Sequence, residues 1–224
     1  MASQLGSRLV FQNARNAVRR AGLSAERAVL SQSYLRFEAA LSVTAQTYTF
    51  DVLVNESINP LFVTQQKLAL QDSFVCSEIG VFLANPATAG VNASNFELYS
   101  YPNQVGFDAT SDQAAYTIYN GSFNLTVNQR TIVTNWDLQR HYCANQTQQL
   151  LTKAAVSPFN AIDQNNFSQD GYYPVEPNIV LVGSKKNLLQ ISLPNALASV
   201  PASGNARLIF IMRGILAQNS TSVN

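Results

Sequence analysis

The sequence predicts an all-β protein, an antiparallel β-sandwich of about eight strands that follows an N-terminal amphipathic helical arm. From Leu41 onward, short runs of β-branched and aromatic residues are separated by Asn, Pro and Gly, and no helical pattern alternates with these runs. Hydrophobic residues make up 46% of the 224 residues and aromatic residues 10%, which is enough to fill a sizeable core. Parallel βαβ winding is therefore disfavoured, and a sandwich or barrel is favoured.

The helical arm precedes the strand runs. Between residues 7 and 21, apolar side chains fall on one side of a helix and the arginines fall largely on the other. Gly22 is a suitable stop for this helix, and residues 24–31 carry the capping pattern of a second short helix. We therefore expect a basic helical arm over residues 1–33 and a single sandwich domain over residues 34–224.

The arm carries most of the positive charge. Residues 1–40 hold six arginines and two glutamates, a net charge of +4, whereas residues 41–224 have a net charge of −3. Arginines on a helix outside a sandwich can contact nucleic-acid phosphates, lipid headgroups or carboxylates of a neighbouring subunit. The candidate contact residues of the arm are Arg8, Arg15, Arg19, Arg20 and Arg27.

Eight runs in the rest of the chain have the composition of strands. They cover residues 42–54, 67–84, 96–102, 114–127, 130–138, 178–183, 187–194 and 206–218. Asn120-Gly121, inside one of these runs, is a strong signal for a hairpin turn. The connections near 84–96 and 143–177 are long and rich in Asn, Gln and Pro, and we expect a short helix near 147–155 in the second of them.

The stretch "GSKKN" at residues 183–187 has the glycine and lysines of a phosphate-binding loop. A phosphate loop needs further glycine and a following helix, because several backbone N–H groups must converge with a helix N-terminus. Here Gly183 stands alone, and the next residues alternate like a strand until Pro194. We therefore interpret residues 183–187 as a hairpin tip between residues 178–182 and 188–193, with both lysines in solvent.

The scarcity of histidine limits the possible chemistry. His141 is the one histidine of the chain, and Asp137 and Cys143 lie near it in sequence. A cysteine nucleophile also needs an oriented base and an oxyanion hole, and this spacing establishes neither, so we expect a surface histidine beside a buried cysteine. One histidine and two separated cysteines fall short of a structural zinc site. We expect no enzymatic activity, no cofactor and no metal, and the sequence leaves open whether Cys76 and Cys143 form a disulfide.

Sugar binding is the alternative function. Lectin-like β-sandwiches bind glycans with exposed aromatic and amide side chains. Trp136 and the run "DGYYPVEPN" at residues 170–178 supply both kinds of group. The candidate glycan contacts are Trp136, Tyr172 and Tyr173, although Tyr-Pro pairs also serve to stiffen loops at a sandwich rim.

Amide side chains outnumber charged side chains in this sequence. The sequence holds 22 Asn and 18 Gln against 27 charged residues. Burying an amide against a partner costs less free energy than burying an unpaired charge, so this composition suits a surface that neighbouring subunits cover. We expect a homo-oligomer and no small-molecule substrate. The N-terminus lacks the apolar core of a signal peptide, so we expect synthesis in the cytoplasm.

Several segments together suggest a family. After the basic helix, "YTFDVLV", "LQDSFVCSEIGVFLA", "LYSYPN", "YTIYNGSFNLTVN" and "RLIFIMRGILAQ" resemble the jelly-roll structural proteins of icosahedral bacteriophage virions in architecture and composition, over residues 41–217. The resemblance implies a jelly-roll-like sandwich of two four-stranded sheets and a capsid subunit that assembles with itself and with other virion proteins. It also implies location in the virion after synthesis in the host cytoplasm. The arm would then contact a neighbouring subunit, the genome or an internal membrane.

Overall fold

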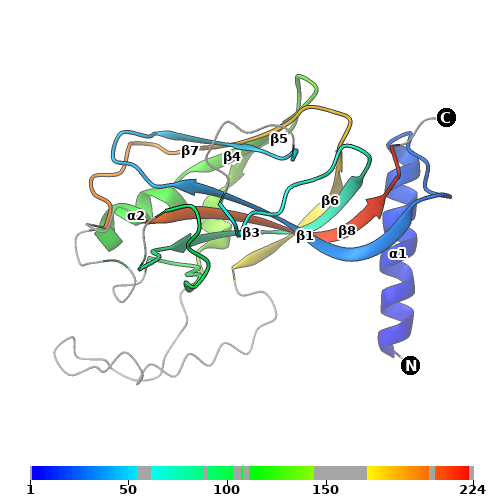
Figure 1. The fold of residues 1–224 in the computed structure, drawn as a ribbon, viewed down its shortest axis with the longest axis horizontal. Helices are drawn as coiled ribbons and strands as arrows, with labels where there is room; N and C mark the ends of the chain where they lie inside the picture. The colour runs from blue at the N-terminus through cyan, green and yellow to red at the C-terminus, as the bar shows by residue number, and fades with distance from the viewer. Residues whose placement is uncertain are drawn as a thin grey trace.

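The structure is a computed structural model and describes residues 2–54, 62–87, 90–102, 107, 111–143, 171–201 and 205–221. It confirms the antiparallel β-sandwich, with two four-stranded sheets that pack face to face (Figure 1). The first sheet holds, side by side in this order, β1 (Val29–Ala40), β8 (Arg207–Gln218), β3 (Ser73–Ala84) and β6 (Tyr172–Val182). The second sheet holds β2 (Thr47–Asp51), β7 (Asn187–Ser192), β4 (Ser122–Val127) and β5 (Arg130–Asp137).

The strands pair in a nested order. The first strand pairs with the last, β2 with β7, β3 with β6 and β4 with β5, and all of these pairs are antiparallel. Two further pairings, β8 with β3 and β7 with β4, complete the sheets. Among connections between consecutive strands, only that from β4 to β5 stays within one sheet. The other connections cross between the sheets, so pairing in this fold is mostly between segments far apart in sequence.

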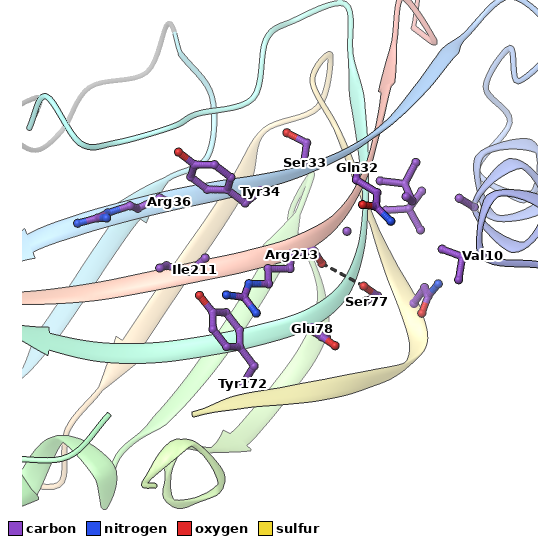
Figure 2. Close-up of a pocket in the computed structure, with 15 residues that line it drawn as sticks. Val10, Gln32, Ser33, Tyr34, Arg36, Ser77, Glu78, Tyr172, Ile211 and Arg213 are labelled. Atoms are coloured by element: carbon purple, nitrogen blue, oxygen red, sulfur yellow. Dashed lines mark hydrogen bonds between the residues drawn. The ribbon is translucent and has the colours of Figure 1, made fainter. Parts of the chain in front are cut away.

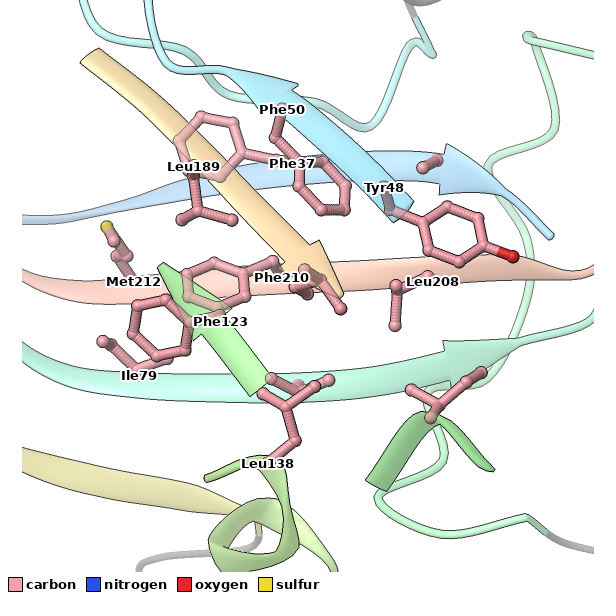
Figure 3. Packing of buried hydrophobic residues seen from close by; sticks show 14 of the residues in the cluster. Phe37, Tyr48, Phe50, Ile79, Phe123, Leu138, Leu189, Leu208, Phe210 and Met212 are labelled. Carbon is pink, nitrogen blue, oxygen red and sulfur yellow. The ribbon is translucent and has the colours of Figure 1, made fainter. Parts of the chain in front are cut away.

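The core lies between the two sheets and is built by alternation along each strand. In β8, Leu208, Phe210 and Met212 are fully buried and face the second sheet (Figure 3). The ring of Phe210 lies 5.2 Å from that of Phe123 in β4 and 6.4 Å from that of Phe50 in β2. Side chains of both sheets therefore interdigitate through aromatic contacts.

The first helix is present and ends where the sequence predicts. Helix α1 spans Ala2–Arg20, and Gly22 follows it with a φ of +77°. The N–H of Gly22 donates to the carbonyl of Arg19, and that of Leu23 donates to the carbonyl of Val18. These two bonds form a Schellman motif, which requires a left-handed residue at the position of Gly22.

The second predicted helix, over residues 24–31, is wrong. This segment forms a turn and then enters β1, which begins at Val29, so the strand domain starts before the predicted boundary at residue 34. Leu35, Phe37 and Ala39 alternate into the core, and this period of two outweighs the capping signal at Ser24. The prediction that strand character starts at Leu41 therefore missed the whole of β1.

The predicted hairpin at Asn120-Gly121 is also wrong. Residues Ser111–Tyr119 form helix α2, which buries Ala115, Ile118 and Tyr119 against the main core at helical spacing. Gly121 then makes the turn into β4, and a Cβ there would lie 2.6 Å from a backbone carbonyl oxygen. The tight hairpin of this region joins β4 to β5 through Asn128 and Gln129, whose φ angles of 46° and 68° are typical of a type I′ turn.

Residues 183–187 form a tight turn, as predicted, but not a hairpin. β6 lies in the first sheet and β7 in the second, so this turn crosses from one sheet to the other. The side-chain amide of Asn187 fixes the turn by donating to the carbonyls of Val182 and Lys185. Lys186 is exposed and Lys185 is half-buried. The turn leads into a strand, so it lacks the helix N-terminus that a phosphate loop needs.

Two other predicted elements differ or are not described. Residues 96–102 form no regular strand and contribute one isolated bridge, between Leu83 and Tyr99. The helix predicted near 147–155 lies outside the described residues.

The aromatic contact across the core predicts the cost of removing it. We expect Phe210→Ala to lower the free energy of unfolding by about 3–5 kcal/mol, because the cavity would lie between two sheets that cannot collapse onto it. Ile132→Ala on the exposed side of β5 is the control, since 44% of Ile132 is exposed, and should change the free energy by less than about 0.5 kcal/mol. Denaturant unfolding of both variants measures the difference, and equal effects would contradict this description of the core.

Candidate functional site

The arm docks on the outer face of the first sheet. Helix α1 crosses the strands at one end of the sandwich, and its N-terminal half extends beyond the sheets (Figure 1). Ala14 and Val18 are buried against Val75 of β3 and Ile215 of β8. Val10, one helical turn before Ala14, remains 47% exposed. The apolar side of the predicted arm is therefore divided, with its C-terminal half docked and part of its N-terminal half exposed.

The described arginines of the arm are not part of the docked apolar contact. Arg15, Arg19, Arg20 and Arg27 are exposed, while the side chain of Arg8 lies outside the described residues. Arg19 forms an ion pair with Glu26, which folds back beside the end of α1. Arg15 and Arg20 are thus exposed on α1, where an anionic partner could reach them.

Beside α1, the same outer face carries an open groove with a volume of about 590 Å³. Val10 and Ala14 form its wall on the helix side, and Figure 2 shows strands β1, β8, β3 and β6 beneath it. Its far side carries Arg213, whose guanidinium lies 3.5 Å from the ring centre of Tyr172. Gln32 and Tyr34 of β1 add exposed amide and hydroxyl groups. The groove combines an apolar end with a polar end, which suits a polypeptide segment or an amphipathic ligand.

A buried ion pair closes the other end of this face. Glu38 of β1 is fully buried and accepts hydrogen bonds from Arg36 at 2.8 Å, from Arg207 at 2.9 Å and from the hydroxyl of Thr64. Arg207 also donates to the carbonyl of Gly90 at 2.7 Å. A buried charge is tolerated only when it is paired and hydrogen-bonded, so this network fixes two loops onto the sheet. No local pattern in the sequence reveals this network, because Glu38 and Arg207 are far apart in the chain and β1 was not predicted.

The predicted glycan contacts do not form one site. Trp136 and Tyr173 lie together with ring centres 5.8 Å apart, at the edge where β5 and β6 meet, and Arg140 lies 5.1 Å from both rings. Tyr172 is buried on the opposite side of β6, where it packs on Phe82. The contacts around Trp136 occupy the ring that a sugar would need to stack on, and they join the edges of the two sheets.

His141 is buried, so the expectation of a surface histidine is wrong. It ends a short 3₁₀ helix, Leu138–His141, and its Nε2 accepts the indole N–H of Trp136 at 3.0 Å. Its Nδ1 lies 3.2 Å from the carbonyl oxygen of Gly171, so the neutral ring donates there. Burial lowers the pKa of His141 to about 4. A histidine with both nitrogens bonded and a low pKa is a structural link between β5 and β6 rather than a base.

The two cysteines are not joined by a disulfide. Cys76 is buried and Cys143 half-buried, and both are free thiols. Burial raises the pKa of Cys76, which leaves an unreactive thiol. Across the described ranges, no three His, Cys, Asp or Glu residues gather where they could hold a metal ion. No described helix has the length and apolar character to cross a membrane.

Comparison with known proteins gives no relatives: no family model matches the sequence, and no curated protein or solved structure matches the chain.

The link through His141 predicts a loss of stability in acid. The unfolded histidine binds a proton below about pH 6.5 and the folded one only below about pH 4, so the unfolded state gains protons first as the pH falls. The free energy of unfolding should therefore decrease by about 1.4 kcal/mol per pH unit between these values from this group alone.

Comparison with His141→Gln isolates this contribution from that of the carboxylates. The variant should be less stable near neutral pH and should lose stability with a shallower slope between pH 6.5 and 4, measured by denaturant unfolding at each pH. Equal slopes for the two proteins would show that His141 does not titrate differently on folding.

Proposed function

We propose that the protein is a non-enzymatic structural protein of a viral particle, a jelly-roll subunit that assembles with itself into the capsid shell of an icosahedral bacteriophage. The nested pairing of the strands is the observation that carries the proposal. A jelly roll is a long antiparallel ribbon of eight strands rolled into two sheets, so its first strand pairs with its last and each inner pair follows in turn. The pairing of β1 with β8, β2 with β7, β3 with β6 and β4 with β5 supports the proposal.

The surface supports an assembling role. Amide residues outnumber charged ones, and exposed apolar side chains such as Leu9, Val10 and Tyr34 lie on or near the outer face of the first sheet. A subunit that neighbours cover can keep such groups, because amides are cheaper to desolvate than unpaired charges.

The arm supports a second contact. Its docked half holds α1 on the sheet, while the exposed Arg15 and Arg20 and the protruding half of the helix can meet a neighbouring subunit, genome nucleic acid or the headgroups of an internal membrane. Other virion proteins are further partners of the same kind. In this role the protein needs no cofactor and no small-molecule substrate.

Glycan binding through Trp136 and Tyr173 receives less support. The indole N–H of Trp136 is bonded to His141, and Arg140 lies over the ring. A sugar would need that N–H or a free aromatic face. Binding on a glycan array that disappears in Trp136→Ala would favour this function over the structural one.

Assembly of the purified chain tests the proposal. We expect the 24.5 kDa chain to sediment as multimers or closed particles at micromolar concentration. The reason is that an amide-rich surface and an exposed arm suit contacts with neighbouring subunits. Sedimentation velocity and electron microscopy measure this outcome. A monomer at every concentration, both alone and with other virion proteins, would contradict it.

Removal of α1 separates folding from assembly. Deletion of residues 1–22 stops before β1 and before Ser24, whose N–H donates to the carbonyl of Ser220. We expect this variant to keep a cooperative unfolding transition with a free energy lower by about 2–4 kcal/mol, because the residues under Val18 become exposed. It should also assemble poorly.

Salt identifies the partner of the arm in the full chain. Binding to phosphates or anionic headgroups should weaken strongly between low and physiological salt, whereas docking in an apolar groove of a neighbour should change little.

Loss of the cooperative unfolding transition in the variant that lacks residues 1–22 would instead show that α1 belongs to the folding core.

A further inference from the structure

Strand β1 is an edge of the first sheet with an open outer side. On the side away from β8, Arg36 exchanges two backbone hydrogen bonds of 2.9 Å with Gln66. Alternate residues of a strand direct their N–H and C=O groups to the same side, and β1 stays in continuous register with β8. Leu30, Gln32 and Tyr34 therefore direct theirs to the side of Gln66, and within the described ranges no backbone group bonds to them there.

The other three sheet edges carry features that obstruct the addition of a strand. β6 contains Pro174 and Pro177, which lack N–H donors. The pairing of β5 with β4 shifts register twice, and Asn135 within β5 has a φ of 50°. β2 has only 5 residues, whereas β1 has 12. Among the four edges, β1 is thus the long and regular one.

The open part of β1 is chemically symmetric about its centre. It reads "VLSQSYL" from Val29 to Leu35, with Gln32 in the middle, and it contains no charged residue. When two copies lie antiparallel about Gln32, each residue is opposed by a residue of similar polarity. The opposed positions are Val29 with Leu35, Leu30 with Tyr34, Ser31 with Ser33, and Gln32 with Gln32.

We propose, on the basis of the self-assembly proposed above, that two copies of the chain pair antiparallel along β1 about a two-fold axis at Gln32. The pairing joins two four-stranded sheets into one continuous sheet. Leu30, Gln32 and Tyr34 supply the backbone bonds, because they carry the N–H and C=O groups on the open side. Tyr34 is 50% exposed and gains an apolar cross-strand neighbour in Leu30 of the second copy.

The register follows from the ends of the open edge. Gln66 occupies the side of Arg36 at one end, and β1 begins at Val29 at the other. A shift of the pairing by two residues would oppose Gln32 to Leu30 or to Tyr34 and would lose the amide pair. The symmetric register also brings no like charges together, because the paired segment, residues 29–35, contains no charged residue.

Charge substitution at the axis tests the pairing in the full chain. Gln32 is exposed, so Gln32→Lys and Gln32→Glu leave the fold intact, but each variant opposes two like charges across the axis. Each variant alone should raise the dissociation constant of the pair of chains at least about tenfold. An equimolar mixture of the two should restore the pairing, because opposite charges then meet. Sedimentation velocity at micromolar concentration measures the mass in each case.

Gln139→Lys and Gln139→Glu, the same changes at an exposed residue of the 3₁₀ helix, are the matched controls and should behave as the unsubstituted chain. Hydrogen exchange provides a second readout: amides of Leu30, Gln32 and Tyr34 should be protected in the paired chain and exposed in Gln32→Lys. Wild-type mass in both single Gln32 variants, or no recovery in the mixture, overturns the pairing along β1 while self-assembly stands. An unsubstituted chain that is monomeric alone overturns this pairing, and one that also stays monomeric with other virion proteins at every concentration contradicts the proposed function.

Discussion

The contact of Phe210 with Phe50 and Phe123 joins the two sheets, and the rest of the structure depends on it. Each sheet has one apolar face, and the free energy gained by burying these faces together outweighs the entropy lost in ordering strands that are distant in sequence. Since most connections between strands cross between the sheets, neither sheet can form alone from a continuous segment. We therefore expect the two sheets to fold together in one cooperative transition.

The outer face of the first sheet is covered at its two ends and open between them. Helix α1 covers one end through Ala14 and Val18, and the network of Glu38 and Arg207 fixes loops over the other end. Between them the groove remains open (Figure 2). Apolar contacts hold α1 at one end, and the buried ion pair holds the loops at the other. The uncovered middle is where Gln32 and Tyr34 remain accessible, next to the open edge of β1.

The sequence predicts the fold class and the helix well because both depend on local patterns. Gly22 ends α1 as expected, alternation marks β7, and a continuous run of large apolar residues marks β8. Turn signals mislead where strands cross between sheets: Asn120-Gly121 predicts a hairpin, yet the segment before it is a helix that closes the core. The pairing of Glu38 with Arg207 and the burial of His141 depend on contacts between distant segments, so no local pattern reveals them.

Pairing along β1 also sets the direction in which the two subunits face. Directly opposed residues of an antiparallel pair point to the same side of a sheet, so Gln32 of both copies lies on the outer face that carries α1. Both helices and both grooves then lie on one side of the joined sheet, and both second sheets lie on the other. In the proposed shell, every arm would then face the same surface. This polarity is what a subunit needs if exposed arginines such as Arg15 and Arg20 are to meet an anionic partner on only one side of the shell.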